Sequence, residues 1–436
     1  MITLIKNGRI VDPLSGTDET LDILIDKGKI VDLKPRIDAA SVQVIDAARL
    51  VVAPGFIDMH VHLREPGQEH KETIATGSRA AAKGGFTSVC AMPNTSPVND
   101  SPRVTEYIRS EALKQAVVNV FPVSALTKEL KGKELTDMAG QVAAGVVAFS
   151  DDGRCIQDSR TMARALDESK SLNTLLIDHC EDQSLSEGGV MHEGPISQKL
   201  GLRGVPSAAE EIMVARDIIL AERAASRVHI AHLSSKGSVR LVREAKKRMP
   251  NVSAEVTPHH LLLTDACLES YETNYKVNPP LRGESDVRAL IEAVRDGTVD
   301  VIATDHAPHA AEEKGLGLDK APFGMVGLET AVSLVLDRLV NKGVISLAKF
   351  IEMVSTTPAQ LLGLKSKGRI ALGADADLTI LNLHQEVVVD VNAFQSKSRN
   401  SPFDGWKLKG GPAMTIVAGR VVYPFSTGSR LSGGMT

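Results

Sequence analysis

The chain has 436 residues, of which 43% are hydrophobic and 24% are charged, as in ordinary globular proteins. A formal net charge of −4 and a sequence pI near 6.3 provide no basic surface for nucleic acid or an anionic membrane. The four cysteines form no Cys-x-x-Cys pair, and no uncharged apolar stretch is long enough to cross a bilayer. We therefore expect a soluble, cytoplasmic protein that binds neither nucleic acid nor membranes.

Both ends of the chain have the pattern of short β-strands. In the first fifty residues, Asn7-Gly8 and Lys27-Gly28 separate alternating apolar segments and are predicted to be hairpin turns. The last seventy residues return to this pattern in ADLTILNL, EVVVDV and MTIVAGRVVY. We predict that residues 1–53 and 365–436 pair into one small β-sandwich domain, and that the final STGSRLSGGMT is loosely held.

Residues 54–364 alternate short apolar runs with longer helical patterns, which is typical of β/α units around a parallel sheet. The helical pattern is clearest in residues 206–226 and in SVRLVREAKKRM. Eight strand–helix units predict a (β/α)8 TIM barrel. The predicted strands are 56–62, 87–93, 118–126, 145–152, 174–181, 227–234, 252–260 and 300–309.

Histidines and aspartates recur at the ends of five predicted strands. In a barrel these ends meet on one face, and imidazoles and carboxylates are ligands that zinc accepts. Strand alternation groups His232 with Val228 and Ile230, and favours Asp152 over Asp151 as the inward carboxylate. A lone His-x-His pair would more often be two hydrogen-bonded core histidines. Six convergent ligands instead indicate two metal ions that activate water for hydrolysis, and these ligands are His60, His62, Asp152, His179, His232 and Asp305.

A series of motifs gives the chain a resemblance to a known family. GFIDMHVHLREPG, AMPNT, FSDDG, TPHHL, KVNPPLR, ATDHAPH and GLET follow one another as in the dihydroorotases of the cyclic amidohydrolase superfamily. GADADLTIL is similar to a strand of the superfamily's β-sandwich, so the resemblance covers essentially the whole chain. It implies reversible, zinc-dependent hydrolysis of dihydroorotate to N-carbamoyl-L-aspartate, a step of pyrimidine biosynthesis.

The resemblance also implies roles for individual residues. Two zinc ions would share the six ligands, and they would be held by His60, His62 and Asp305, by His179 and His232, and by Asp152 between them. We predict that Asp305 is also the catalytic residue that moves a proton from the attacking water to the departing nitrogen. Substrate binding would fall to His62, Arg64, Asn94, Asn278 and His309, and to the backbone of Phe323 and Gly324.

Two alternative functions stay open at this point. A hydantoinase or allantoinase would share the fold and the metals, but many superfamily members bridge the metals with a carboxylated lysine after the fourth strand. This chain has AFSDDG there, which is the pattern of dihydroorotases with an aspartate bridge. A non-catalytic, dihydroorotase-like partner of aspartate transcarbamoylase would have lost metal ligands, whereas this chain retains all six. A homodimer and a complex with aspartate transcarbamoylase also stay open.

Other polar residues receive more ordinary interpretations. His259 and His260 end the seventh predicted strand, and we expect them to be structural because two ions need no further ligands. The segment 310–327 is charged and then rich in glycine. It is either a solvated loop or a lid that closes over the substrate.

Overall fold

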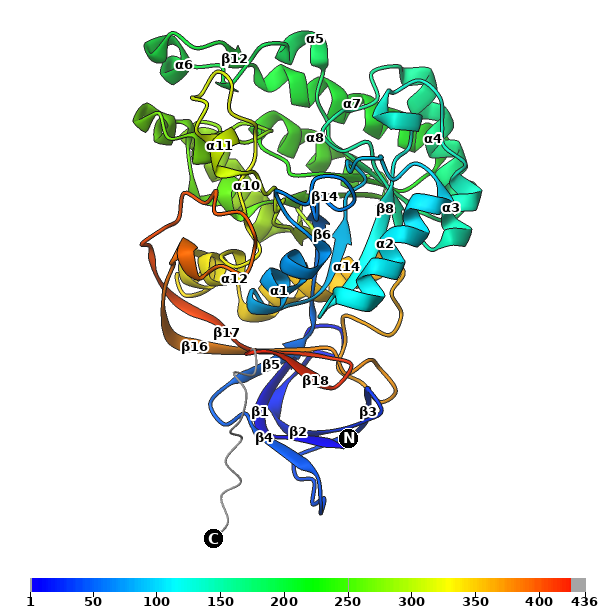
Figure 1. Cartoon of the computed structure of the whole chain (residues 1–436), viewed down its shortest axis with the longest axis vertical. Coiled ribbons are helices and arrows are strands. Elements are labelled where there is room, and N and C mark those ends of the chain that lie inside the picture. The colour runs from blue at the N-terminus through cyan, green and yellow to red at the C-terminus, as the bar shows by residue number, and fades with distance from the viewer. Residues whose placement is uncertain (1, 250, 425–436) are drawn as a thin grey trace.

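The computed structural model describes residues 2–249 and 251–424, so the predicted loose tail at 426–436 lies outside the described residues. A barrel wrapped in helices sits above a β-sheet domain, and strands from the first and the last parts of the described chain share that lower domain (Figure 1). The predicted fold class, a (β/α)8 barrel with a small β domain formed by both termini, is confirmed. The exact boundaries 1–53, 54–364 and 365–436 stay a prediction.

The barrel is built from eight parallel strands within the described part of the chain, one for each predicted strand. In space they follow the order β15-β14-β13-β10-β9-β8-β7-β6. The first and last strands of this order, β15 and β6, approach each other just beyond their ends. There the His62 amide donates a hydrogen bond to the His306 carbonyl at 2.9 Å. The strands are β6 (Phe56–Val61), β7 (Phe86–Ala91), β8 (Asn119–Ser124), β9 (Ala148–Phe149), β10 (Leu175–Asp178), β13 (Val228–Ile230), β14 (Val252–Val256) and β15 (Val301–Ile302).

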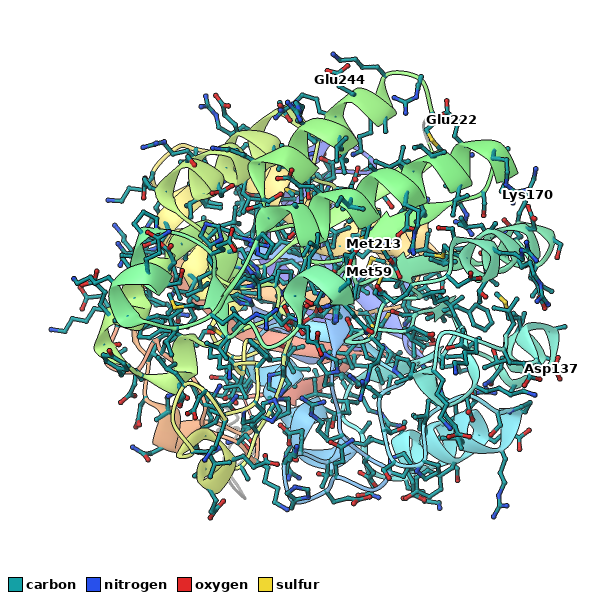
Figure 2. The ribbon with its side chains drawn as sticks, turned by 90° about the horizontal axis from the view of Figure 1, so that it is seen from above. Met59, Asp137, Lys170, Met213, Glu222 and Glu244 are labelled. Carbon is teal, nitrogen blue, oxygen red and sulfur yellow. The ribbon has the colours of Figure 1, made fainter. Side chains whose placement is uncertain are left out.

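Helices cover the outside of the barrel. Viewed from above, fully buried Met59 lies near the middle, and the labelled charged residues Asp137, Lys170, Glu222 and Glu244 lie at the rim (Figure 2). Both predicted helical segments are confirmed, as α7 (Ser207–Ala224) and α8 (Lys236–Lys246). The other helices that follow barrel strands are α1 (Ile74–Lys83), α2 (Pro102–Gln115), α3 (Met138–Ala144), α4 (Ser159–Ser171), α10 (Glu284–Asp296) and α12 (Ala331–Val335).

Shorter elements connect or extend these units. They are α5 (Gln183–Ser186), β11 (Met191–His192), α6 (Pro195–Leu200), β12 (Gly204–Val205), α9 (Pro258–Leu262), α11 (Ala311–Lys314), α13 (Leu347–Ile351) and α14 (Thr357–Leu361). Across residues 2–249 and 251–424, no helix has the length and hydrophobicity that a membrane span requires.

The lower domain joins the two termini in one sheet, with the order β18-β17-β16-β5-β1-β2-β3 and with β4 beside β1. The junction is antiparallel, and Ala53 of β5 faces Thr379 of β16. Apolar side chains from both termini share one core, among them Ile10, Val52 and Ile380. The strands are β1 (Thr3–Asp12), β2 (Thr17–Asp26), β3 (Lys29–Lys34), β4 (Gln43–Asp46), β5 (Val51–Pro54), β16 (Leu378–Val388), β17 (Lys407–Val417) and β18 (Arg420–Tyr423).

One of the two predicted hairpin turns is wrong. Lys27-Gly28 does join β2 to β3, with positive φ at both residues. Asn7-Gly8 instead lies inside β1, where the pairing with β2 shifts register and Asn7 has a φ of 61°. A bulge needs a left-handed residue as much as a hairpin does, so an Asn-Gly pair fits both. Gly8 is required by packing, because a Cβ there would lie 2.6 Å from Val52 Cγ2.

Candidate metal centre

The structure brings the six predicted metal ligands together at the carboxyl ends of the barrel strands, where all of them are buried. Asp152 lies among the four histidines. Its Oδ1 is 3.1 Å from His60 Nε2, and its Oδ2 is 3.4 Å from His62 Nε2. The same Oδ1 is 3.7 Å from His179 Nδ1 and 3.6 Å from His232 Nε2. One carboxylate therefore faces both halves of the cluster.

Asp305 lies on the side of the cluster that is formed by His60 and His62. Its Oδ1 lies 3.2 Å from His62 Nε2 and 3.7 Å from His60 Nε2. The backbone is left-handed at Asp305, with a φ of 47°, and at His232, with a φ of 30°. Non-glycine residues adopt such conformations at a cost of about 1–3 kcal/mol each, and they concentrate at functional sites. Local backbone turns after strands β15 and β13 therefore set the directions of the Asp305 and His232 side chains.

The orientation of the ligand atoms fits a metal centre. His60 Nε2 and Asp152 Oδ1 are buried and make no hydrogen bond within the described residues, although they lie only 3.1 Å apart. Two overlapping groups have ligand atoms within 4.8 Å of one another: His60, His62 and Asp305, and His60, Asp152 and His232. Buried polar atoms without partners are costly unless a ligand completes them. The donors are of the nitrogen and oxygen type that zinc and similar ions bind.

Asp151 points away from this centre. Its Oδ1 accepts hydrogen bonds from the backbone amides of Leu126 and Thr127, at 2.8 and 3.0 Å, and its Oδ2 accepts one from the Thr127 hydroxyl. The structure thus brings Asp152, and not Asp151, to the histidines. Its role as a bridge between two ions stays a prediction.

Glu255, a fully buried carboxylate on β14, also belongs to the site but was not predicted from the sequence. Its Oε1 accepts from His60 Nδ1 at 2.7 Å and from the His232 amide at 3.3 Å, and its Oε2 lies 3.2 Å from His229 Nε2. Burial raises the pKa of Glu255, but the His60 and His229 imidazoles outweigh burial and hold this pKa well below its usual range. Glu255 therefore orients ligands from both halves of the centre, as carboxylates behind metal-binding histidines commonly do.

The sequence analysis also missed Glu181. Its Oε2 accepts from His179 Nε2 at 3.0 Å and from Asn278 Nδ2 at 2.9 Å. Burial opposes ionisation, yet His179 lowers the pKa of Glu181 to about 2. In return, Glu181 overcomes the effect of burial and raises the pKa of His179 to about 9. Because Nε2 donates its hydrogen bond to Glu181, His179 Nδ1 is left to face Asp152 and His232.

The side chains predicted to bind substrate contact the proposed ligands or one another, as Asn278 Nδ2 does at 3.4 Å from His179 Nε2 and Arg64 Nη2 at 3.5 Å from His309 Nε2. Asn94 Oδ1 lies 2.8 Å from His62 Nδ1. Arg64 is only 8% exposed, donates to the Pro308 carbonyl at 3.2 Å, and has no ion-pair partner within 4.0 Å among the described residues. His309 Nε2 donates to the Phe323 carbonyl at 2.8 Å. A buried guanidinium without a carboxylate is suited to bind an anionic ligand.

Comparison with known proteins now identifies the family. A model described as dihydro-orotase-like matches residues 48–238, and one described as amidohydrolase family matches residues 315–423. The chain is 54% identical over 422 residues to a dihydroorotase of Pelotomaculum thermopropionicum, covering 97% of this chain and 98% of the relative. A dihydroorotase of Bacillus cytotoxicus is 48% identical, covering 96% and 98%. The chain belongs to the dihydroorotase family.

Solved hydantoinases share the fold of this dihydroorotase-family chain. An L-hydantoinase (dihydropyrimidinase) from Arthrobacter aurescens superposes with a TM-score of 0.88 at 27% identity, covering 96% of this chain and 95% of that one. A D-hydantoinase gives a TM-score of 0.86 at 26% identity, covering 97% and 95%. The barrel alone does not separate the two activities. The much higher identity to dihydroorotases favours that family over the hydantoinase alternative.

Two local expectations are corrected by the structure. The seventh strand, predicted to reach residue 260, ends at Val256, because Pro258 begins helix α9. His260 on this helix has a structural environment, with Thr257 Oγ1 at 2.8 Å and the Pro279 carbonyl at 2.9 Å. The predicted grouping of His232 with Val228 and Ile230 is also wrong. Those two apolar side chains pack in the outer core, under the helices, whereas His232 faces the centre.

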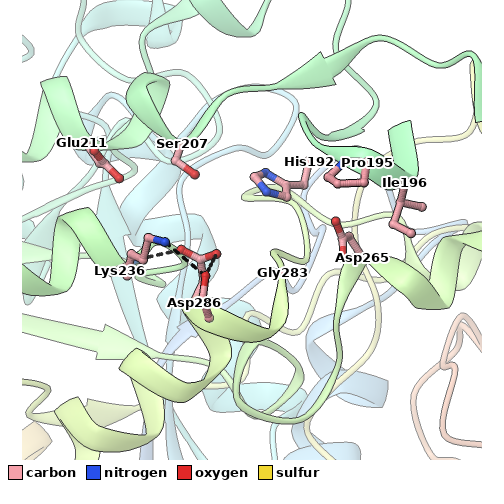
Figure 3. Close-up of a pocket in the computed structure, with 10 residues that line it drawn as sticks. His192, Pro195, Ile196, Ser207, Glu211, Lys236, Asp265, Gly283 and Asp286 are labelled. Atoms are coloured by element: carbon pink, nitrogen blue, oxygen red, sulfur yellow. Dashed lines mark hydrogen bonds between the residues drawn. The ribbon is translucent and has the colours of Figure 1, made fainter. Parts of the chain in front are cut away.

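A separate cavity of about 480 Å³ opens near the N-terminal ends of α7, α8 and α10 (Figure 3). His192, Lys236 and Asp286 are among its lining residues, and the Lys236 amide donates to Asp286 Oδ1 at 3.0 Å. None of the six predicted metal ligands lines this cavity. This cavity is therefore distinct from the cluster at the strand ends.

Proposed function

We propose that this chain catalyses the reversible hydrolysis of dihydroorotate to N-carbamoyl-L-aspartate, the dihydroorotase step of pyrimidine biosynthesis. The observation that carries the proposal is the position of Asp152, whose carboxylate lies within 3.7 Å of all four histidines. A metal-dependent hydrolase needs such a converging set, and Arg64 at its mouth suits a substrate with a carboxylate.

The centre is proposed to hold two zinc ions. One ion would be bound by His60, His62 and Asp305, the other by His179 and His232, with Asp152 shared between them. When bound, such a pair supplies an activated water and polarises the carbonyl that is attacked. Glu255 and Glu181 support the assignment, because each accepts a hydrogen bond from one ring N–H of a proposed ligand histidine and leaves the other ring nitrogen for the metal.

Asp305 is proposed to move the proton during hydrolysis. Burial raises the pKa of Asp305, but its bond to His62 and the charges of the neighbouring histidines outweigh burial and hold this pKa below its usual range. The ionised carboxylate can take a proton from the water that attacks the ring carbonyl. As the amide C–N bond breaks, Asp305 delivers this proton to the departing nitrogen, so that one water is consumed and the proton balance is closed.

Arg64, Asn94 and His309 are proposed to recognise the carboxylate of the substrate. Burial, followed by the charge of Arg64, lowers the pKa of His309 to about 2, so its imidazole stays neutral. Its buried Nδ1 makes no hydrogen bond within the described residues. His62 and Asn278 would contribute polar contacts. The Phe323 carbonyl accepts a hydrogen bond from His309, so the backbone of Phe323 and Gly324 lies beside this residue. This backbone would complete the binding surface.

Metal analysis and a substrate comparison test this proposal together. The purified protein is expected to hold two zinc ions per chain and to hydrolyse dihydroorotate much faster than hydantoin or allantoin. Faster turnover of hydantoin would support the hydantoinase alternative instead. One ion or none in a fully active preparation would contradict the two-metal centre. Sedimentation of the protein, alone and with aspartate transcarbamoylase, tests the homodimer and the complex.

A further inference from the structure

A second set of buried ligand side chains lies outside the barrel, behind the strand end that carries His179. Asp178 is the last residue of β10, and Cys180 follows His179 on its other side. Asp217 comes from helix α7, and Cys155 from the segment between β9 and α4. We call Cys155, Asp178, Cys180 and Asp217 the outer cluster; all four side chains are at most 4% exposed.

The spacing within the outer cluster is that of a metal coordination shell. Asp178 Oδ2 lies 3.5 Å from both Cys155 Sγ and Cys180 Sγ, and Cys180 Sγ lies 3.4 Å from Asp217 Oδ2. Ligand atoms of Asp178, Cys180 and Asp217 lie within 4.8 Å of one another. Tetrahedral zinc binds sulfur at about 2.3 Å and oxygen at about 2.1 Å, which separates neighbouring sulfur and oxygen ligands by roughly 3.5 Å.

The outer cluster also contains an incompletely satisfied carboxylate. Asp178 Oδ1 is buried and has no hydrogen-bond partner in the described part of the chain. Arg216 Nη2 lies 2.7 Å from Asp217 Oδ1, which leaves the other Asp217 oxygen facing Cys180. A buried polar oxygen without a donor is costly, so a cation that both oxygens of Asp178 contact would remove a penalty that the protein otherwise carries.

The donor atoms of the outer cluster indicate what that ligand is. Burial and the neighbouring Asp178 carboxylate raise the pKa of Asp217 well above its usual range, which favours its neutral form when no cation is bound. A divalent cation that displaces the Asp217 proton and one thiol proton would keep the cluster and the Arg216 guanidinium neutral. Buried charges are tolerated when they are paired, and thiolates prefer soft or borderline metals. We propose that the outer cluster binds a thiophilic divalent cation such as Zn²⁺ or Cd²⁺, at a site separate from the catalytic centre.

Binding at this site would join β10 to α7 directly behind His179. The thiol proton of Cys180 and the carboxyl proton of Asp217 leave as the cation binds, and Arg216 stays as the counter-charge of Asp217. The competing arrangement is a purely structural one, in which both thiols donate hydrogen bonds to Asp178 and no cation is bound. The two arrangements have different consequences for the sulfur atoms, which can be observed directly.

Cadmium is a suitable probe because the proposed catalytic ligands are all nitrogen and oxygen atoms. A thiolate-to-cadmium charge-transfer band in the ultraviolet therefore reports only on cysteine. In titrations of the full-length protein we expect a saturable band that is retained in a Cys90→Ser, Cys267→Ser control. The band should vanish in Cys155→Ser, Cys180→Ser, and Asp217→Asn should keep it but weaken cadmium binding by at least about tenfold.

Several results would overturn the proposal. These are the absence of a band in folded wild-type protein, its survival without Cys155 and Cys180, or unchanged cadmium affinity in Asp217→Asn. If the double variant Cys155→Ser, Cys180→Ser does not fold, the cadmium affinity of Asp217→Asn tests the proposal instead, because this variant keeps both sulfur atoms. The readout does not depend on turnover. Failure of this proposal would therefore leave the proposed dihydroorotase activity intact, and dihydroorotate hydrolysis measured on the same samples tests that activity separately.

Discussion

Replacing Glu255 by glutamine is expected to weaken metal binding while leaving the barrel intact. The substitution keeps the side-chain volume but replaces the charged carboxylate by a neutral amide. In the wild type, Oε1 of this carboxylate accepts a hydrogen bond from His60 Nδ1 at 2.7 Å, and Oε2 lies 3.2 Å from His229 Nε2. A glutamine amide has one accepting oxygen, so one of the two imidazoles loses its acceptor. Hydrogen bonds to charged groups contribute about 1.5–3 kcal/mol, which corresponds to roughly 10- to 100-fold in metal affinity.

The assay measures zinc affinity by competition with a chromophoric chelator, and kcat/KM for dihydroorotate at saturating zinc. Glu210→Gln is the matched control, because Glu210 is also a buried carboxylate but binds the amides of Ser234 and Ser235, at 3.1 Å each. Both variants should lose some stability towards urea. Only Glu255→Gln should lose zinc affinity. Wild-type affinity in that variant, or an equal loss in the control, would refute the argument.

Four further predictions concern single side chains. Asp305→Asn should keep the fold and lose about 10²–10⁴-fold in turnover, and near-normal turnover with both metals bound would exclude the proton-transfer role. Arg64→Lys should raise KM for dihydroorotate at least about tenfold, because a point charge does not replace a planar fork; equal wild-type rates on dihydrouracil would contradict carboxylate recognition. In bicarbonate-free buffer, Asp152→Ala should lose zinc and Asp151→Ala should retain it, as elemental analysis would show; the reverse result would reassign the bridge. Burial lowers the pKa of Lys314 to about 7, so the unfolded chain binds more protons than the folded chain above that pH. Urea unfolding from pH 7 to 10 should therefore show wild-type stability rising relative to Lys314→Met by about 3.5 kcal/mol, and parallel curves would count against it.

The fold was predictable because hydrophobic periodicity is a local property. Alternation also worked where a strand is regular: Leu175 and Ile177 face the inner core, and His179 continues on the same side. It failed at β13, which spans only three residues. There His229 faces Glu255, and His232 reaches the centre through a left-handed turn of the backbone. The spacing of apolar residues in the sequence does not reveal that a backbone turn after the strand changes the side to which a side chain points.

The supporting carboxylates could not be found by the same means. Glu255 lies 195 positions from His60 in the chain, and only the closed barrel brings the two side chains together. Its one visible signal is a charged residue inside the apolar strand VSAEV, which an exposed edge would explain equally well. Glu181 likewise follows a predicted ligand by two residues, and its role depends on which ring nitrogen of His179 it contacts. Such contacts follow from packing rather than from local pattern.

The adjacent aspartates after β9 show which physical property distinguishes a ligand from a structural residue. Strand alternation favoured Asp152, but β9 covers only Ala148–Phe149, so the regular strand that this reasoning assumed does not extend to either aspartate. What separates them is hydrogen bonding. Asp151 accepts from two backbone amides, and moving it to the metals would leave both donors unsatisfied at about 1–3 kcal/mol each. Asp152 Oδ1 makes no hydrogen bond within the described chain while lying close to three histidine nitrogens. This difference suits Asp151 to a structural role and Asp152 to the proposed role of a ligand shared by two cations.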